Sequence, residues 1–406
     1  MTIGVGGTSA ESALDALSDM TGDIKRIGTD EFQARLSALQ VQIRESGATA
    51  VYLHAGTNLY YFTALRWSPS ERMVAAIVPA EGDVQYIAPA FELDTLKDYW
   101  QIPGAIHAWE EHESPYELLG TALRSCASET ATSIQLLVDE AAPFFIVDGI
   151  QKANPDFRLV LAQPITQSLR SRKTKTEIEL IRRAHEMTLE VHRAAASILR
   201  EGITTGEVVE FIDKAHQRVG ADAGSYFCIV LFGVATSFPH GVKDPQTLAA
   251  GDWVLIDTGC LLDGYNSDIT RSFCFGEPTD RQRSAWESEK AAQIAAFDAA
   301  VPGAPCEDCD NAARKALEQA GFGPDYQLPG LPHRTGHGCG LDIHEGPNLV
   351  RGETTPLDVG MVFSSEPMLV LPGEFGVRLE DHFYMTENGP EWFTEPSKSV
   401  DDPFGT

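Results

Sequence analysis

The sequence predicts an α/β N-terminal domain followed by an α+β domain that is built from two similar halves. A chain of 406 residues is long enough for two or three domains. Strands and helices alternate through its first third, and a pattern of helix, glycine, strand and acid occurs twice later. We expect a poorly ordered leader over residues 1–30, the N-terminal domain over 31–168 and the C-terminal domain over 174–406.

The N-terminal domain is predicted from apolar periodicity. Residues 32–46 place Phe32, Leu36, Leu39 and Ile43 on one helical face. Short apolar runs bounded by turn residues indicate strands, and these lie at 48–53, 73–79, 84–87 and 134–139, with a helix over 141–152.

The boundary between the domains is marked by a change of pattern. Pro164 and a polar, basic stretch precede a long helix that begins at Lys175. Apolar residues at helical spacing in that helix predict one buried face: Ile178, Ile181, Ala184, Met187 and Val191.

The second domain repeats one pattern. A capping box at Thr204–Glu207 starts a helix that ends near Gly220, and a second helix over 308–320 ends at Gly321. Each helix is followed by a histidine-containing loop and then by an apolar strand. In both copies an acid lies six positions after a glycine, in residues 251–257 of the first copy and 360–366 of the second. A second acid follows each first one, so the repeat predicts duplicated halves that face each other.

Composition excludes several classes of protein. The chain has a formal net charge of -28 and lacks the basic stripe that nucleic-acid binding requires. This negative charge also disfavours binding to anionic membrane surfaces. No apolar run is long enough to span a bilayer, and residues 1–20 do not resemble a secretory signal. The seven cysteines do not form a disulfide framework. We therefore expect a cytoplasmic protein without nucleic-acid or membrane partners.

The acids of the repeat indicate metal binding. Asp257, Asp268, Glu366 and Glu380 end or interrupt apolar strands, where a carboxylate is unfavourable unless it is paired, protonated or bound to metal. Few Lys or Arg residues lie nearby in the sequence. Divalent metal is therefore the simplest counter-charge.

A glycine-rich loop supplies imidazoles. His333, His337 and His344 fall within residues 331–344, and His240 lies in the corresponding loop of the first half. One imidazole with four carboxylates is a hard, oxygen-rich set that suits Mn²⁺ and tolerates Co²⁺ or Zn²⁺. Four carboxylates carry enough charge for two divalent ions, which can hold a bridging hydroxide and polarise a carbonyl for amide hydrolysis.

The ordered motifs resemble those of the pita-bread metallopeptidases, which include prolidase, aminopeptidase P and methionine aminopeptidase. They are residues 256–259, 267–271, 333–344, 365–367 and 378–381. Residues 173–184 resemble the family's entry into its catalytic domain, and residues 58–63 resemble a segment of the prolidase branch. The resemblance thus covers nearly the whole chain after the leader.

The resemblance implies a role for each site residue. Asp257 would bind one metal ion, His337 and Glu366 the other, and Asp268 and Glu380 would bridge both. Glu366 would also move the proton of the nucleophile.

It also implies residues that meet substrate. His240 and His344 would stabilise the intermediate, His333 would line the substrate pocket, and Arg378 would orient Glu380 or meet substrate. Val370 departs from the family, whose members often carry tyrosine there, which puts rate and substrate range in doubt.

The function predicted from this resemblance is hydrolysis of Xaa-Pro dipeptides by a metal-bridging hydroxide. Alternatives are an aminopeptidase P that acts on longer Xaa-Pro peptides, an ectoine-type amide hydrolase, and a catalytically silent binding protein on the same fold. The expected ligand is a small peptide that ends in proline. The aromatic segment 60–62 and Trp67, which in relatives approach a neighbouring subunit, predict a homodimer.

Overall fold

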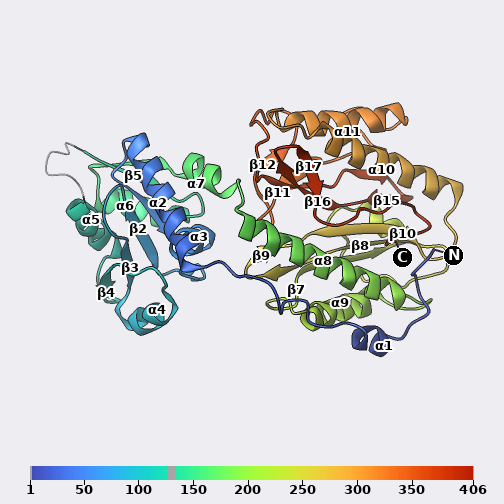
Figure 1. Ribbon diagram of the computed structural model, residues 1–406, viewed down its shortest axis with the longest axis horizontal. Coiled ribbons are helices and arrows are strands. Elements are labelled where there is room, and N and C mark those ends of the chain that lie inside the picture. The colour runs from blue at the N-terminus through green and yellow to red at the C-terminus, as the bar shows by residue number, and fades with distance from the viewer. Residues whose placement is uncertain (1, 127–132, 406) are drawn as a thin grey trace. The chain divides into compact units, whose positions relative to one another are not determined.

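The computed structural model describes residues 2–126 and 133–405, and the chain divides into two compact units. One unit is Ile27–Arg170, and the other combines Met1–Arg26 with Ser171–Thr406 (Figure 1). Within the described residues, no helix is long and apolar enough to cross a lipid bilayer.

The unit Ile27–Arg170 is built on a six-stranded sheet with the order β4-β3-β2-β1-β5-β6. Strand β2 is antiparallel to both of its neighbours, and the other pairs are parallel. The central strands are buried along their whole length, as expected when helices cover both faces of a sheet. The strands are β1 (Ala50–His54), β2 (Ala75–Pro79), β3 (Gln85–Pro89), β4 (Ala105–Trp109), β5 (Ile134–Val138) and β6 (Phe157–Leu161).

The helices of this unit follow the apolar pattern only in part. Helix α2 (Thr29–Ser46) buries Phe32, Leu39 and Ile43 and ends at Gly47, whose φ of 71° suits glycine. Helix α7 (Gln163–Arg170) covers part of the polar stretch that was interpreted as a boundary. Its buried residues are polar and hydrogen-bonded, since Thr166 donates to Glu140 and Arg170 to Asn58. The remaining helices are α3 (Thr57–Thr63), η1 (Ala90–Glu92), α4 (Leu93–Tyr99), α5 (Pro115–Cys126), α6 (Phe144–Ala153) and α7 (Gln163–Arg170).

The other unit contains the two similar halves. The first half comprises α8 (Lys175–Ser197), α9 (Thr205–Val219), β7 (Ser225–Phe232), η2 (Gly233–Ser237), β8 (Trp253–Leu262), β9 (Tyr265–Asn266) and β10 (Ile269–Cys274). The second comprises α10 (Asp280–Ala299), α11 (Glu307–Gln319), β11 (Gly336–Gly338), β12 (Glu345–Leu349), β13 (Val362–Ser365), β14 (Met368–Leu371), β15 (Phe375–Arg378), β16 (Asp381–Thr386) and β17 (Gly389–Trp392).

Each half arranges its strands in the same way. In the first, β8 lies between antiparallel β7 and β10, and in the second, β13 lies between antiparallel β11 and β16. The first acid of each half lies in or just after the middle strand, and the second acid immediately precedes the third strand. The isolated bridge between Thr270 and Glu380 brings the third strands of the two halves together. This equivalence confirms the predicted duplication.

The predicted helix starts of this unit are also present. Thr204 accepts a hydrogen bond from the Glu207 backbone amide, and the Glu207 carboxylate accepts one from the Thr204 amide. Thr174 and Glu177 form the same capping box at α8. Such caps satisfy backbone donors that a helix end leaves unpaired.

The expectation of a poorly ordered leader over residues 1–30 is wrong. The amides of Ile3, Gly6 and Met20 donate to the carbonyls of Asp401, Ala196 and Val219, and helix α1 (Ala10–Asp15) buries Ala13. A Gly/Ser/Ala-rich segment carries little hydrophobic signal of its own, so its order depends on the surface that it covers.

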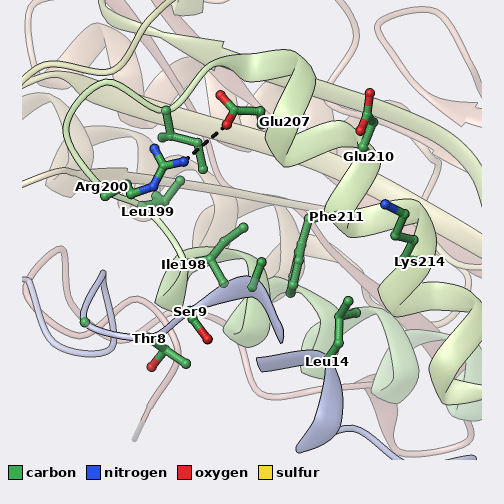
Figure 2. A pocket seen from close by; sticks show the side chains of 13 residues that line it. Thr8, Ser9, Leu14, Ile198, Leu199, Arg200, Glu207, Glu210, Phe211 and Lys214 are labelled. Atoms are coloured by element: carbon green, nitrogen blue, oxygen red, sulfur yellow. Dashed lines mark hydrogen bonds and ion pairs between the residues drawn. The ribbon is translucent and has the colours of Figure 1, made fainter. Parts of the chain in front are cut away.

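This N-terminal segment also encloses a pocket of about 640 Å³ against α9. Figure 2 shows Leu14 and Phe211 among the apolar side chains of this pocket, and the Arg200–Glu207 ion pair at its edge. None of the predicted site residues lines it. The pocket is therefore separate from the predicted metal centre.

Candidate metal centre

Four of the five predicted metal ligands approach one another around the His337 imidazole. Its Nε2 atom lies 3.1 Å from Glu366 Oε1, 3.8 Å from Asp268 Oδ2 and 4.0 Å from Glu380 Oε1. The His337 Nδ1–H donates to the Gly338 carbonyl at 3.0 Å, because a carbonyl can only accept. The opposite nitrogen, Nε2, therefore faces the carboxylates, as in metal sites where a backbone carbonyl orients the ligating imidazole.

The fifth predicted ligand, Asp257, is linked to the others through Arg378. The Arg378 guanidinium donates to Asp257 Oδ2, to Thr270 Oγ1 at 3.1 Å and to the Pro239 carbonyl at 3.2 Å. The Thr270 hydroxyl in turn donates to Glu380 Oε2 at 2.7 Å. Arg378 was expected to orient Glu380 or to meet substrate. Its hydrogen bonds connect it to Glu380 through Thr270, and its carboxylate hydrogen-bond partner is Asp257.

The strand that carries Glu380 is held by a buried polar network. Arg271 donates to the Glu380 carbonyl at 2.9 Å and to Asp381 Oδ1 at 2.7 Å. Gln293 donates to Asp381 Oδ2 at 3.0 Å. Because these groups are fully buried, the network fixes the backbone from which Glu380 projects.

The carboxyl groups of the cluster carry more negative charge than the nearby cations neutralise. Burial raises the pKa of Asp257 to about 6, that of Glu380 to about 7, and that of Asp268 well above its ordinary value. The neighbouring carboxylates act in the same direction. Burial opposes ionisation of Glu366 as well, but its hydrogen bond and charge interaction with His337 hold the pKa of Glu366 below its usual range.

Two fully buried oxygens of this set have no hydrogen-bond partner among the described residues. They are Asp257 Oδ1 and Glu380 Oε1, and buried carboxylate oxygens are normally paired. Oxygen donors with one imidazole suit divalent ions such as Mn²⁺, Co²⁺ and Zn²⁺. The orphaned oxygens, the excess of negative charge and the donor types together fit a bound metal centre.

The histidines predicted to meet substrate surround the cluster at different depths. The His344 ring is centred 4.3 Å from that of His337 in a T-shaped arrangement, and its pKa falls to about 4, first through burial and then through the charge of His337. His333 Nδ1–H donates to the Arg334 carbonyl at 2.6 Å, and its Nε2 has no partner among the described residues. His240 is exposed and lines a hollow of about 310 Å³ beside β7.

His382, just past Glu380, was interpreted from the sequence as a structural or supporting residue and not as a ligand. One donor atom from each of Asp268, His337, Glu380 and His382 can be chosen so that all four lie within 4.8 Å of one another. His382 Nε2 is 3.5 Å from Glu380 Oε1. The spacing from Glu380 could have identified it. Residues two apart in an extended strand share one face, and His382 follows Glu380 by two positions.

Val370 lies in β14 and is 4% exposed. Its backbone exchanges hydrogen bonds with Gly330, three residues before His333. An apolar residue therefore occupies the position at which the resemblance to the pita-bread family led us to look for tyrosine.

Comparison with known proteins agrees with this geometry. Residues 179–387 match the model of "Metallopeptidase family M24", and residues 35–172 match that of "Creatinase/Prolidase N-terminal domain". The chain is 32% identical over 369 residues to the protein named "Putative dipeptidase YkvY" of Bacillus subtilis (strain 168), which covers 90% of this chain and 99% of that protein.

Solved structures give the same result. The dipeptidase PepE from Mycobacterium ulcerans matches with a TM-score of 0.84 and 30% identity, over 91% of this chain and 97% of that one. A prolidase from Thermococcus sibiricus matches with a TM-score of 0.82 and 29% identity, over 91% and 98%. The chain belongs to metallopeptidase family M24, in its dipeptidase and prolidase-like group, and has the pita-bread fold preceded by a creatinase-type domain.

Proposed function

We propose that this protein is an Xaa-Pro dipeptidase that works with two divalent metal ions, Mn²⁺ in preference to Co²⁺ or Zn²⁺. The observation that carries the proposal is the set of four carboxylates and His337, all buried except the partly buried Glu366, which has more negative charge than its neighbouring cations balance. The similarity to proteins titled dipeptidase and prolidase supports the choice of substrate class.

Asp257, Asp268, His337, Glu366 and Glu380 would hold the ions. Bound there, the ions would supply Lewis acidity and a nucleophilic hydroxide at neutral pH. Arg378 keeps Asp257 ionised and oriented through their buried ion pair. The Ser364 hydroxyl donates to Glu366 Oε1 at 3.3 Å and accepts from the His337 backbone amide at 2.9 Å, which links the Glu366 carboxylate to the backbone that carries His337.

Glu366 is the proposed proton carrier. Its carboxylate is ionised in the absence of metal because of His337, so it is available to accept a proton from the attacking water. The same proton then passes to the proline nitrogen as the amide bond breaks, and the products are an amino acid and free proline.

His344, His240 and His333 are the proposed substrate contacts. A His344 pKa of about 4 keeps its imidazole neutral near pH 7, so one nitrogen carries a proton that can be donated to the carbonyl oxygen of the tetrahedral intermediate. His333 Nε2 is buried without a partner among the described residues. Because Nδ1–H donates to the Arg334 carbonyl, Nε2 would accept a hydrogen bond from a donor group of the substrate. Arg378 would act on substrate through Asp257.

The experiment is a comparison of substrates under added Mn²⁺, Co²⁺ or Zn²⁺, with the metal content measured by elemental analysis. We expect two ions per chain, hydrolysis of an Xaa-Pro dipeptide, and much slower cleavage of an Xaa-Pro-Yaa tripeptide and of ectoine. Preference for the tripeptide would assign an aminopeptidase P instead, and preference for ectoine an amide hydrolase.

We also propose a cytoplasmic homodimer. Tyr60, Tyr61 and Phe62 are buried within their own unit, so they do not offer the contact surface that motivated this prediction, whereas Trp67 is partly exposed. Light scattering on the purified protein tests the proposal, and a monomeric mass would contradict it.

A further inference from the structure

His382 is positioned by the strand that also presents Glu380. Strand β16 begins at Asp381, so Glu380 and His382 flank its first residue and project to the same face. In the register with β13, His382 lies opposite Ser364, the residue whose hydroxyl contacts both Glu366 and the His337 amide. The imidazole therefore faces the cluster from its own strand.

The His382 ring is held in place by aromatic packing. The His185 ring is centred 4.7 Å from it, and His185 is in turn stacked on Phe393 at 5.2 Å with an interplanar angle of 13°. His185 Nδ1–H donates to the Ile181 carbonyl at 2.8 Å. Because this stack limits movement of the His382 ring, Nε2 stays directed toward Glu380.

Neither ring nitrogen of His382 has a hydrogen-bond partner among the described residues, although its side chain is 0% exposed. The nearest carboxylate atom, Glu380 Oε1, is also unpaired and lies 3.5 Å away. Two buried polar atoms that face each other without satisfying each other are unusual in native proteins. A cation between them would satisfy both, since each offers a lone pair.

We propose that His382 Nε2 is a sixth protein ligand of the metal centre and binds the divalent ion that Asp268, His337 and Glu380 also contact. The inference rests on the proposed metal centre and adds to it. A second imidazole makes one of the two sites richer in nitrogen, which raises the affinity of that site for Co²⁺ and Zn²⁺, relative to Mn²⁺, above that of the other site. It predicts two non-equivalent sites, with the nitrogen-rich one filled first by Co²⁺.

Proton NMR of the Co²⁺-loaded protein tests this directly. Each imidazole bound to Co²⁺ gives one strongly shifted, exchangeable N–H signal from its other nitrogen. We expect two such signals in the wild type and one in His382→Ala, with the signal of His337 retained. His344→Ala is the matched control, because His344 lies next to His337 but is outside the group of four donors, and it should keep both signals.

The outcomes separate the two proposals. A single shifted N–H signal in the wild type, or loss of the second signal in His344→Ala rather than in His382→Ala, overturns ligation by His382 and leaves the metal centre intact. Failure of the wild type to bind Co²⁺ or Mn²⁺ overturns the proposed function as well. The number of shifted N–H signals in the wild type tests the proposal by itself. The test therefore holds even if a variant folds poorly.

A competition experiment gives a second readout. In His382→Ala we expect the ratio of the Co²⁺ and Mn²⁺ dissociation constants of the tighter site to shift by at least about tenfold toward Mn²⁺. An equal weakening for both metals would show that His382 acts only by supporting Glu380, and this result would overturn ligation.

Discussion

Arg378 and Asp257 form a buried ion pair in which the two side chains are 4% and 9% exposed. The pair joins the last residue of β15 to the middle of β8, so that it links the two halves of the catalytic unit. It also supplies positive charge at a site that is otherwise rich in carboxylates.

Replacement of Arg378 by Met should therefore destabilise the metal-free protein by about 3–5 kcal/mol, because Asp257 is left buried without a partner. The loss should be smaller when Mn²⁺ is present, since the ion replaces part of the missing charge. Urea unfolding with EDTA and with Mn²⁺ measures both values. Arg378→Lys is the control that keeps the charge but loses the forked geometry. An equal loss of unfolding free energy with and without Mn²⁺ would contradict the claim that the ion and Arg378 both balance the charge of Asp257.

Asp268→Ala should abolish metal-dependent hydrolysis. Removal of this proposed bridging carboxylate is expected to raise the barrier by about 4 kcal/mol, which lowers the rate roughly 10³-fold, and to reduce the bound metal below two ions per chain. Kinetics with an Xaa-Pro dipeptide and elemental analysis provide the measurements. Asp280→Asn changes an exposed acid at the start of α10 and should retain both properties. Full Mn²⁺-dependent activity in the Asp268 variant would show that Asp268 is not a metal ligand.

Because of His216, we expect the free energy of unfolding to fall in acid, independently of the metal ligands. Burial lowers its pKa to about 4 from an ordinary value of 6.5, and its ring contacts Thr188 Oγ1 at 3.2 Å and Ser225 Oγ at 2.8 Å. The unfolded state therefore binds a proton first as the pH falls. Stability from this group is present above pH 6.5 and is lost as the pH falls toward 4, by about 3 kcal/mol.

The test compares wild type with His216→Gln in denaturant unfolding between pH 7 and pH 4. The difference in unfolding free energy between the two proteins should change by about 3 kcal/mol across this range, in favour of the variant at low pH. Parallel stability curves would show that protonation of His216 does not contribute.

Deletion of residues 2–20 should destabilise the catalytic unit. The deletion removes several backbone hydrogen bonds to that unit, among them those of Ile3, Gly6 and Met20, which are worth roughly 3 kcal/mol together at about 1 kcal/mol each. It also uncovers the pocket in Figure 2. Hydrogen exchange measured by mass spectrometry should show faster exchange in α8 and α9 and no change in β1–β6. Unchanged protection in α9 would mean that the segment contributes little.

Much of the fold could be predicted because its signals are local. The Thr204 and Thr174 capping boxes and the glycine stops lie within a few residues of the helix ends that they define. Four of the five candidate ligands stand out because they are acids that end or interrupt apolar strands, and His337 stands out by its glycine-rich loop. The N-terminal segment was misjudged because its order comes from contacts with residues about 200 or more positions away, such as Asp401. Helix α7 was missed because its sequence is polar.

The sequence by itself determined the two-domain organisation, the duplicated halves and the types of donor atom at the site, since these follow from residue chemistry and from spacing along the chain. Only the tertiary structure decided which groups meet. The Thr270–Glu380 bridge joins strands from the two halves, and this pairing sets Arg378 on Asp257 and turns His382 toward Glu380. The reason is that side chains on different strands approach one another only when the sheet register is formed, and no short stretch of sequence specifies that register.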